Sequence, residues 1–240
     1  KAGKRDIVNE AFRVLRTNFE FTIGTPPEQN VIVFTSLNPG SGKSHLAANM
    51  AMSLAIKKKK VLLIDGDLRH GSSSMLIGSP GEGLSDYLNG RIADIHDILH
   101  KGEESGLVKY FDLIPIGTIP PNPTELLFTP LLEQMIKTMR QEYDYVFIDC
   151  PPIEVVADTP IYEQFADRTI FVVRAGLMER NMLPEIDALY KEKKFKNMTM
   201  ILNGTKARGG RYGSHYGYGY GYGYGYGFNY NKEMSWGGNS

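Results

Sequence analysis

The sequence predicts a doubly wound α/β fold, in which helices flank a mostly parallel β-sheet. Short β-rich runs alternate along the chain with longer stretches of helical character. Several of the short runs are apolar at consecutive positions, as strands buried on both faces of a sheet require. The chain has 240 residues, of which 42% are hydrophobic, and this is enough for one such domain with or without a tail.

The first predicted element is an amphipathic helix over residues 7–23. Apolar side chains recur near helical spacing from Ile7 to Phe19, and Asp6 is the predicted N-cap. The Pro26–Pro27 pair that follows cannot continue a helix, so the element ends there.

Strands and helices then alternate through the body of the chain. The predicted strands are Val31–Ser36, Val61–Asp65, Phe111–Ile116, Tyr145–Asp149, Thr169–Val173 and Met198–Leu202. Helical stretches follow four of them, near residues 43–57, 124–141, 158–167 and 181–194. This order predicts strand–helix–strand units that build a parallel sheet.

The first strand leads into a glycine-rich loop and a helix start, residues 37–44. Gly40 and Gly42 lack a Cβ, which lets backbone N–H groups curl around an anion, and the helix N-terminus attracts phosphate. Lys43 is then expected on the β- and γ-phosphates and Ser44 on Mg²⁺. A glycine-rich turn beside a surface lysine is the alternative, but the flanking strand and helix favour an ATP or ADP site.

Two further predicted strands end in carboxylates. Asp65 and Asp67 close the second strand, and Asp149 closes the strand over Tyr145–Asp149. Parallel strands place their carboxyl ends at one edge of the sheet, where ligands bind. Mg²⁺ takes few protein oxygens, and Ser44, Asp67 and Asp149 are its predicted ligands. Asp65 is then predicted to accept the proton of an attacking hydroxyl.

Charge and cysteine content exclude several classes of protein. There are 27 Lys and Arg residues and 27 Asp and Glu residues, so the whole chain gives no reason to expect nucleic acid as a partner. The single cysteine excludes a disulfide within the chain and fits a reducing compartment. No apolar run is long enough to span a membrane. The chain begins at Lys1, so we expect an excised fragment from which a membrane segment can be missing.

Residues 205–240 are predicted to form a flexible tail distinct from a domain over residues 1–204. The tail repeats Tyr-Gly from Tyr216 to Gly227 and has almost no aliphatic residues, so it cannot bury enough surface to offset its chain entropy. Its four basic residues and one glutamate give it a charge of +3, which leaves −3 on the body. An aromatic segment that associates by stacking is the alternative interpretation.

The motifs together resemble those of the bacterial tyrosine kinases (BY-kinases), the cytoplasmic domains of polysaccharide co-polymerases. Pro39–Ser44 resembles the Walker A motif, Leu63–Arg69 the Walker A′ motif and Phe147–Pro152 the Walker B motif. Residues 83–90 and 120–127 and the tyrosine cluster extend the resemblance over essentially the whole chain. It implies a P-loop fold and a kinase that uses ATP and Mg²⁺ to phosphorylate its own C-terminal tyrosines in trans.

The resemblance also implies roles for individual residues. The catalytic set is Lys43, Asp65, Asp67 and Asp149, and the metal ligands are Ser44, Asp67 and Asp149. The nucleotide contacts are Asn38, Pro39, Gly40, Ser41, Gly42, Lys43, Ser44, His45 and Asn203. The phosphate acceptors are Tyr212, Tyr216, Tyr218, Tyr220, Tyr222, Tyr224, Tyr226 and Tyr230.

Partners follow from the same resemblance. Glu10, Arg13 and Arg16 match the family's Glu-x-x-Arg-x-x-Arg helix, which implies assembly of copies of this chain into a ring. Spacing alone favours a solvated charged face. The resemblance further implies attachment to the bacterial inner membrane through an activator segment or chain, a cognate phosphotyrosine phosphatase, and control of capsule or exopolysaccharide export.

Two positions depart from the expected motifs. Leu37 stands where the strict phosphate-loop pattern has glycine, and Ser41 stands where the family has glutamate. Backbone amides surround the phosphates, so binding is expected to survive the change at Ser41, while the loss of a carboxylate near the phosphates can alter affinity or turnover in either direction.

Two other functions remain open from the sequence. The first is an ATPase switch like the septum-site and plasmid-partition proteins, which share the predicted fold. Those proteins carry an extra lysine early in the loop, where this chain has Asn38. The second is a non-catalytic scaffold whose tail associates by stacking. The Asp65-Gly-Asp67 strand end and the tyrosine tail favour the kinase.

Overall fold

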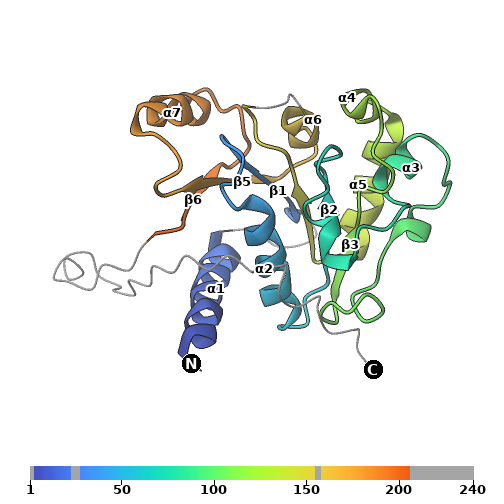
Figure 1. Cartoon of the computed structure of the whole chain (residues 1–240), viewed down its shortest axis with the longest axis horizontal. Coiled ribbons are helices and arrows are strands. Elements are labelled where there is room, and N and C mark those ends of the chain that lie inside the picture. Colours follow the sequence, from blue (N-terminus) through green and yellow to red (C-terminus); the bar gives the residue numbers. More distant parts are fainter. Residues whose placement is uncertain (1–2, 23–27, 155–157, 206–240) are drawn as a thin grey trace, which may run out of the picture.

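The computed structural model describes residues 3–22, 28–154 and 158–205, with side chains from Glu10 onward. These residues build a six-stranded sheet, with order β3-β2-β4-β1-β5-β6, in which every pair of neighbouring strands is parallel (Figure 1). The strands are β1 (Val31–Ser36), β2 (Val61–Asp65), β3 (Phe111–Ile114), β4 (Tyr145–Asp149), β5 (Arg168–Arg174) and β6 (Thr199–Asn203). The first strand of the chain therefore lies in the middle of the sheet, which confirms the predicted doubly wound fold.

Helices cover both faces of the sheet (Figure 1). The α-helices are α1 (Gly3–Thr22), α2 (Lys43–Ala55), α3 (Leu84–Leu88), α4 (Pro123–Leu126), α5 (Pro130–Glu142), α6 (Thr159–Glu163) and α7 (Leu183–Lys191). Short 3₁₀ helices are η1 (Ser74–Ile77), η2 (Ile95–Ile98) and η3 (Arg180–Met182). One face packs against α1 and α2, and the other packs against α3, α5, α6 and α7.

The central strands are buried on both faces, as their uninterrupted apolar runs predict. Every residue of β1, β2 and β4 is buried. Val33 and Ile64 pack toward α5, while Phe34 and Leu63 pack toward α2, because successive side chains of a strand point to opposite faces. Burial of each such side chain stabilises the fold by about 1.5–3 kcal/mol, so the middle of the sheet is a rigid support for the loops at its edge.

Several predicted boundaries differ from the structure. Helix α1 begins at Gly3, so Asp6 lies inside it and is not the N-cap. The predicted helix over 124–141 is two helices, because Pro130 starts a new one after a break. Helix α2 ends at Ala55, and Lys58 adopts a left-handed φ of 62°.

The other boundary changes shorten elements or add them. Strand β3 ends at Ile114, α6 spans Thr159–Glu163 alone, and α7 is preceded by the 3₁₀ turn η3. Helix α3 and the turns η1 and η2 fall in stretches for which the sequence predicted no element. They are too short to show a periodic pattern of apolar residues.

Within the described residues, no helix combines the length and the apolar character needed to cross a membrane. Of the predicted tail, residues 205–240, the structure describes only Thr205.

Candidate active site

The loop between β1 and α2 has the form that an anion site needs. Gly40 and Gly42 both adopt left-handed φ values, 74° and 88°, which an L-residue with a Cβ rarely takes. Helix α2 begins directly afterwards at Lys43, so its unpaired N–H groups and positive end face the loop. Leu37, at the position where the strict pattern has glycine, is buried against Phe171 and Val173 and fixes the start of the loop in the core.

Side chains from distant elements hold the loop by its carbonyl groups. Arg174, at the end of β5, donates Nη1 to the Gly40 carbonyl at 2.8 Å. Asn203, at the end of β6, donates Nδ2 to the Ser41 carbonyl at 3.0 Å. The Ser41 hydroxyl donates to the Asn38 carbonyl at 2.8 Å, which gives this departure from the family motif a role within the loop. Since the carbonyls are engaged, the loop presents its N–H groups to an anion.

The two buried aspartates of the predicted site lie opposite each other. Asp65 at the end of β2 and Asp149 at the end of β4 are partners in the strand register, and both are fully buried. Oδ2 of Asp65 accepts from the Ser74 N–H at 2.6 Å and from the Ser74 hydroxyl at 2.7 Å. Oδ2 of Asp149 accepts from the Ser73 hydroxyl at 2.7 Å. Oδ1 of each is buried with no hydrogen-bond partner among the described residues.

Burial and mutual repulsion alter the acidity of this pair. The pKa of Asp65 is raised to about 7, first by burial and next by the charge of Asp149, while the Ser74 hydrogen bonds oppose the shift. Burial also raises the pKa of Asp149, against the Lys43 charge and the hydroxyls of Ser44 and Ser73. Two carboxylates placed so close favour a cation or a shared proton between them.

The remaining predicted site residues lie at the same edge. Lys43, which is 9% exposed, and Ser44 both lie near enough to Asp149 to oppose the rise of its pKa, Lys43 by its charge and Ser44 by its hydroxyl. Asp67 is buried and accepts from His70 Nδ1 at 3.2 Å. The structure therefore brings the loop, both Walker-type strand ends and Asn203 together, as the sequence predicted.

These residues fit a magnesium ion. A buried carboxylate oxygen without a donor is costly, and Oδ1 of the predicted ligand Asp149 is such an oxygen among the described residues. Ser44 and Asp67 add further hard oxygen atoms nearby, which is the ligand chemistry that Mg²⁺ prefers. The donor set of the site thus matches the ion that the sequence implies.

Asp65, the predicted base, is held at one of its two oxygens. Its Oδ2 accepts from the Ser74 hydroxyl, and the whole side chain is buried. Oδ1, which has no hydrogen-bond partner among the described residues, is the oxygen that could accept a proton.

Other predicted residues lie away from this edge or outside the described residues. Glu10 and Arg13 form an exposed ion pair at 3.1 Å on α1. Arg16 is buried and donates Nη1 to the Ser53 carbonyl at 2.8 Å, so its guanidinium is already engaged within the chain. The eight predicted phosphate acceptors, between Tyr212 and Tyr230, fall outside the described residues.

Sequence reasoning missed four contributors to the site. Ser73, Ser74 and Arg174 contact the predicted residues directly. Arg69 contacts Asp158 at 3.4 Å and Thr124 at 2.8 Å, which joins the turn after β2 to the start of α6 and to α4. The sequence gives little indication of these four residues, because serine is common in turns and arginine is common at or after the end of a strand. Their position at or after strand ends is the one feature of the sequence that points to the site.

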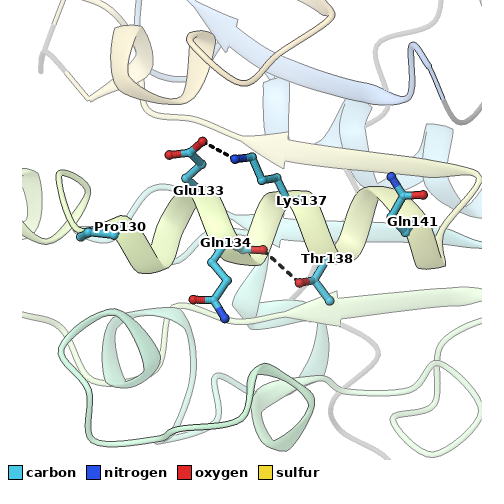
Figure 2. A pocket seen from close by; sticks show the side chains of 6 residues that line it. All are labelled: Pro130, Glu133, Gln134, Lys137, Thr138 and Gln141. Carbon is cyan, nitrogen blue, oxygen red and sulfur yellow. Dashed lines mark hydrogen bonds and ion pairs between the residues drawn. The ribbon is translucent and has the colours of Figure 1, made fainter.

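A shallow hollow elsewhere on the surface has no such features. It runs along the outer side of α5, where Figure 2 shows Glu133 paired with Lys137 at 2.6 Å and the Thr138 hydroxyl on the Gln134 carbonyl. All its lining residues come from α5, and none of them belongs to the predicted site. It is therefore the solvated side of a helix.

Comparison with known proteins identifies relatives of this arrangement. Residues 29–186 match the family model described as an AAA domain. CpsD of Streptococcus agalactiae, a tyrosine-protein kinase, is 34% identical over 208 residues, which cover 86% of this chain and 87% of CpsD. AmsA of Erwinia amylovora is 35% identical over 205 residues, covering 85% of this chain and 26% of AmsA. The chain thus spans most of CpsD but about a quarter of the longer relative.

Two solved structures also match this chain. The kinase domain of the Escherichia coli tyrosine kinase ETK matches with a TM-score of 0.75 and 31% identity, over 91% of this chain and 81% of that domain. The septum site-determining protein MinD of Pyrococcus horikoshii, solved with Mg-ADP, matches with a TM-score of 0.59 and 23% identity, over 73% of this chain and 70% of MinD. At that identity the second match shows the fold alone.

Proposed function

This chain belongs to the AAA-domain family and, within it, to the bacterial tyrosine kinases, and on this premise we propose that it transfers the γ-phosphoryl group of ATP to tyrosines of its own C-terminal segment. One observation carries the proposal: Lys43, Ser44, Asp65, Asp67 and Asp149 meet at one edge of the sheet, where two carboxylate oxygens have no partner in the described part of the chain. The reaction needs positioning and charge neutralisation more than covalent help, and this edge supplies both.

The proposed reaction assigns a task to each of these groups. The N–H groups of the loop and the Lys43 ammonium bind the phosphates and stabilise the charge that moves onto the β-phosphate. A tyrosyl oxygen attacks the γ-phosphorus, the bond from that phosphorus to the bridging oxygen breaks, and ADP leaves. Asp65 Oδ1 takes the phenolic proton. Ser44, Asp67 and Asp149 would hold Mg²⁺, which neutralises phosphate charge when bound.

We propose that the transfer occurs between copies of the chain. The predicted acceptors follow β6, whose last residue Asn203 already touches the phosphate loop. The repeat places glycine at alternate positions between the predicted acceptors. The exposed Glu10–Arg13 pair of α1 supports a contact between copies, whereas Arg16 is engaged within its own chain.

Incubation of the protein with ATP and Mg²⁺, followed by detection of phosphotyrosine, tests the proposal. The tail is expected to become labelled, and Lys43→Met is expected to abolish the label because the phosphates lose their ammonium partner. An ATPase switch would hydrolyse ATP without labelling the protein, and a scaffold would do neither. If the protein with Lys43 intact forms no phosphotyrosine, the kinase function is excluded.

Mixing two variants that cannot phosphorylate themselves tests transfer between copies. One carries Lys43→Met and an intact tail, and the other has its eight tail tyrosines replaced by phenylalanine and an intact site. Label is expected on the Lys43→Met chain only when both are present. If the mixture stays unlabelled while the unmodified protein labels itself, the transfer is intramolecular.

In the cell, we propose that this domain acts at the bacterial inner membrane, joined to an activator segment or chain, and regulates capsule or exopolysaccharide export. A cognate phosphotyrosine phosphatase would reset the tail. Deletion of the gene in its host should change the amount or length of the surface polysaccharide, and restoration with the Lys43→Met form should fail to correct it.

A further inference from the structure

Three serines follow the second strand, and two of them contact the buried aspartates. Ser73 and Ser74 are each 1% exposed, whereas Ser72 is half-buried. The chain turns back after Asp67, because the Gly71 N–H bonds to the Asp67 carbonyl at 3.0 Å and Gly71 adopts a φ of 59°. This turn delivers consecutive serines to the ends of two different strands.

Each serine holds one oxygen of one aspartate. The Ser73 hydroxyl donates to Asp149 Oδ2 at 2.7 Å, and Ser74 donates both its N–H and its hydroxyl to Asp65 Oδ2. The other oxygen of each carboxylate, Oδ1, is the one without a partner among the described residues. Each carboxylate therefore has one oxygen held by a serine and the other left for a ligand.

The Ser74 contact has a defined direction. Its hydroxyl accepts a hydrogen bond from the Ile116 N–H at 2.9 Å, which comes from the loop after β3. A serine hydroxyl has one proton, and this one is directed to Asp65. The loop after β3, Ser74 and Asp65 thus form a chain of donors that fixes the rotation of the carboxylate.

We propose that Ser73 and Ser74 are positioning residues: Ser73 holds Asp149 with its Oδ1 toward the metal ion, and Ser74 holds Asp65 with its Oδ1 toward the incoming tyrosyl hydroxyl. The proposal deepens the proposed function and rests on it for the identity of the ligand. Outer hydrogen-bond partners of this kind orient metal ligands and typically change metal affinity about 10- to 100-fold when removed.

The same contacts have an opposite interpretation, which experiment can separate. If the Ser73 hydroxyl simply occupied a place that the metal needs, its removal would strengthen metal binding. If it orients Asp149, its removal weakens metal binding, because the carboxylate then rotates away and its buried oxygen loses a donor. The sign of the change in affinity decides between the two.

The test measures binding of Mn²⁺, as a probe for Mg²⁺, by electron paramagnetic resonance in the presence of saturating ADP. Ser73→Ala is expected to weaken Mn²⁺ binding about 10-fold or more, and Ser73→Thr, which keeps the hydroxyl, is expected to restore most of it. Ser72→Ala is the matched control, since Ser72 makes no side-chain hydrogen bond within the described residues. Tighter or unchanged binding by Ser73→Ala would overturn the proposal.

Ser74→Ala supplies a second arm through the other aspartate. It is expected to slow phosphotyrosine formation at saturating ATP and Mg²⁺ while leaving ADP affinity within about twofold, since the loop is untouched. Thermal unfolding of every variant shows whether the fold survives. If the unmodified protein fails to make phosphotyrosine while Ser73→Ala still weakens Mn²⁺ binding, the kinase function fails and the positioning role stands. If the unmodified protein makes phosphotyrosine while Ser73→Ala binds Mn²⁺ as tightly as the unmodified protein does, the kinase function stands and the positioning role fails.

Discussion

Asp65 and Asp149 face each other across neighbouring strands, and their setting determines what single substitutions do at the site. Both are fully buried, yet each leaves one oxygen without a hydrogen bond to any residue that the structure describes. Such an arrangement costs stability unless a ligand later uses it. Neutral replacement of either side chain should therefore leave the fold intact or improve it, while it removes a group that the reaction needs.

Asp65→Asn should separate binding from chemistry. The amide keeps the size of the side chain but cannot take a proton, so phosphotyrosine formation should fall about 100- to 10,000-fold. ADP affinity should stay close to that of the unmodified protein, because the phosphate loop is unchanged. A rate of tail phosphorylation that is unaffected by this substitution would remove Asp65 from the role of base.

Gly42→Ala should weaken nucleotide binding for a steric reason. A Cβ at Gly42 would lie 2.4 Å from Asn203 Nδ2, and this contact would push Asn203 off the loop. Gly90→Ala is the matched control, since Gly90 has a similar φ of 79° and open space around it. Both variants should lose about 1 kcal/mol of stability, but only Gly42→Ala should lose ADP affinity in a fluorescence titration. Equal affinities would show that Asn203 does not hold the loop.

At the scale of elements, α1 is attached to the phosphate-binding helix. Arg16 donates to the Ser53 carbonyl at 2.8 Å and to its hydroxyl at 3.1 Å, and Phe12 meets the His45 ring edge-on at 6.4 Å. His45 follows Ser44 directly, so α1 packs on the helix that begins at the phosphates. The predicted oligomerisation motif is thereby divided, with Arg16 facing inward and Glu10 and Arg13 facing out.

Two arginine variants should distinguish the role of Arg16 in stability from the role of Arg13 in oligomer assembly. Arg16→Ala should destabilise the domain by about 2 kcal/mol, because a charged hydrogen bond to the buried Ser53 carbonyl is lost. Arg13→Ala should change stability by less than about 0.5 kcal/mol, since its ion pair is exposed, and should reduce oligomer size. Chemical denaturation and light scattering measure the two effects. A stable Arg16→Ala protein, or an Arg13→Ala protein of unchanged size, would contradict this division.

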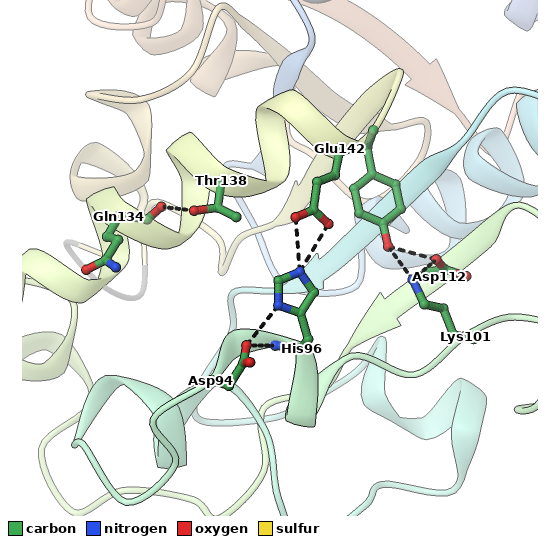
Figure 3. A network of polar contacts seen from close by, with 8 residues as sticks. Asp94, His96, Lys101, Asp112, Gln134, Thr138 and Glu142 are labelled. Carbon is green, nitrogen blue, oxygen red and sulfur yellow. Dashed lines mark hydrogen bonds and ion pairs between the residues drawn. The ribbon is translucent and has the colours of Figure 1, made fainter.

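A histidine joins η2 to α5 at the other side of the molecule. Figure 3 shows His96 between Asp94, at 2.8 Å from Nδ1, and Glu142, at 3.0 Å from Nε2. Both contacts favour the charged ring and raise the pKa of His96 above its ordinary value of 6.5. Folding then stabilises the imidazolium, so this contribution is complete below that ordinary value and is lost as the pH rises through the raised pKa.

The stability of the protein should reflect this titration. Thermal unfolding at about pH 6 and about pH 8 should show a larger difference for the unmodified protein than for His96→Gln. The glutamine variant keeps polar contacts but has no charge to gain. The effect should be small, because the ring is 47% exposed and solvent screens it. If the two proteins show the same difference in thermal stability between the two pH values, the charge of His96 contributes nothing to the contact between η2 and α5.

Much of the element layout could be predicted from the sequence. Strands β1, β2 and β4 were predicted to the residue, because they are buried on both faces and their apolar runs have sharp ends. The break at Pro130 and the short helix α3 were not, since neither changes the apolar pattern enough to be visible. The site was predicted at its carboxylates and loop, and missed where turns bring in Ser73 and Ser74.

At the scale of the whole molecule, charge is divided between the body and the tail. The residues after Gly204 hold a charge of +3, and the remainder holds −3. Each phosphotyrosine would add about −1.5 to −2, so modification of the eight tail tyrosines would make both parts acidic. Subunits that attract one another before the reaction would repel one another after it.

Phosphorylated oligomers should therefore be smaller than unmodified ones. The mass of the particle in solution should increase after phosphatase treatment, and the increase should shrink at high salt as charges are screened. The Lys43→Met form, which carries no phosphate under the proposal, should keep one mass with or without phosphatase. An unchanged mass of the active protein would mean that the tail charge does not govern assembly.

The central place of β1 has a consequence for how the protein is made. A ribosome releases β1 and its loop early, but the neighbours of that strand are β4 and β5, which emerge more than a hundred residues later. The nascent chain thus displays a phosphate loop without Asp149, Arg174 or Asn203 behind it. Under the proposed function, a complete nucleotide site would form only when synthesis of the domain is nearly finished, so a half-made copy would be unable to phosphorylate its neighbours.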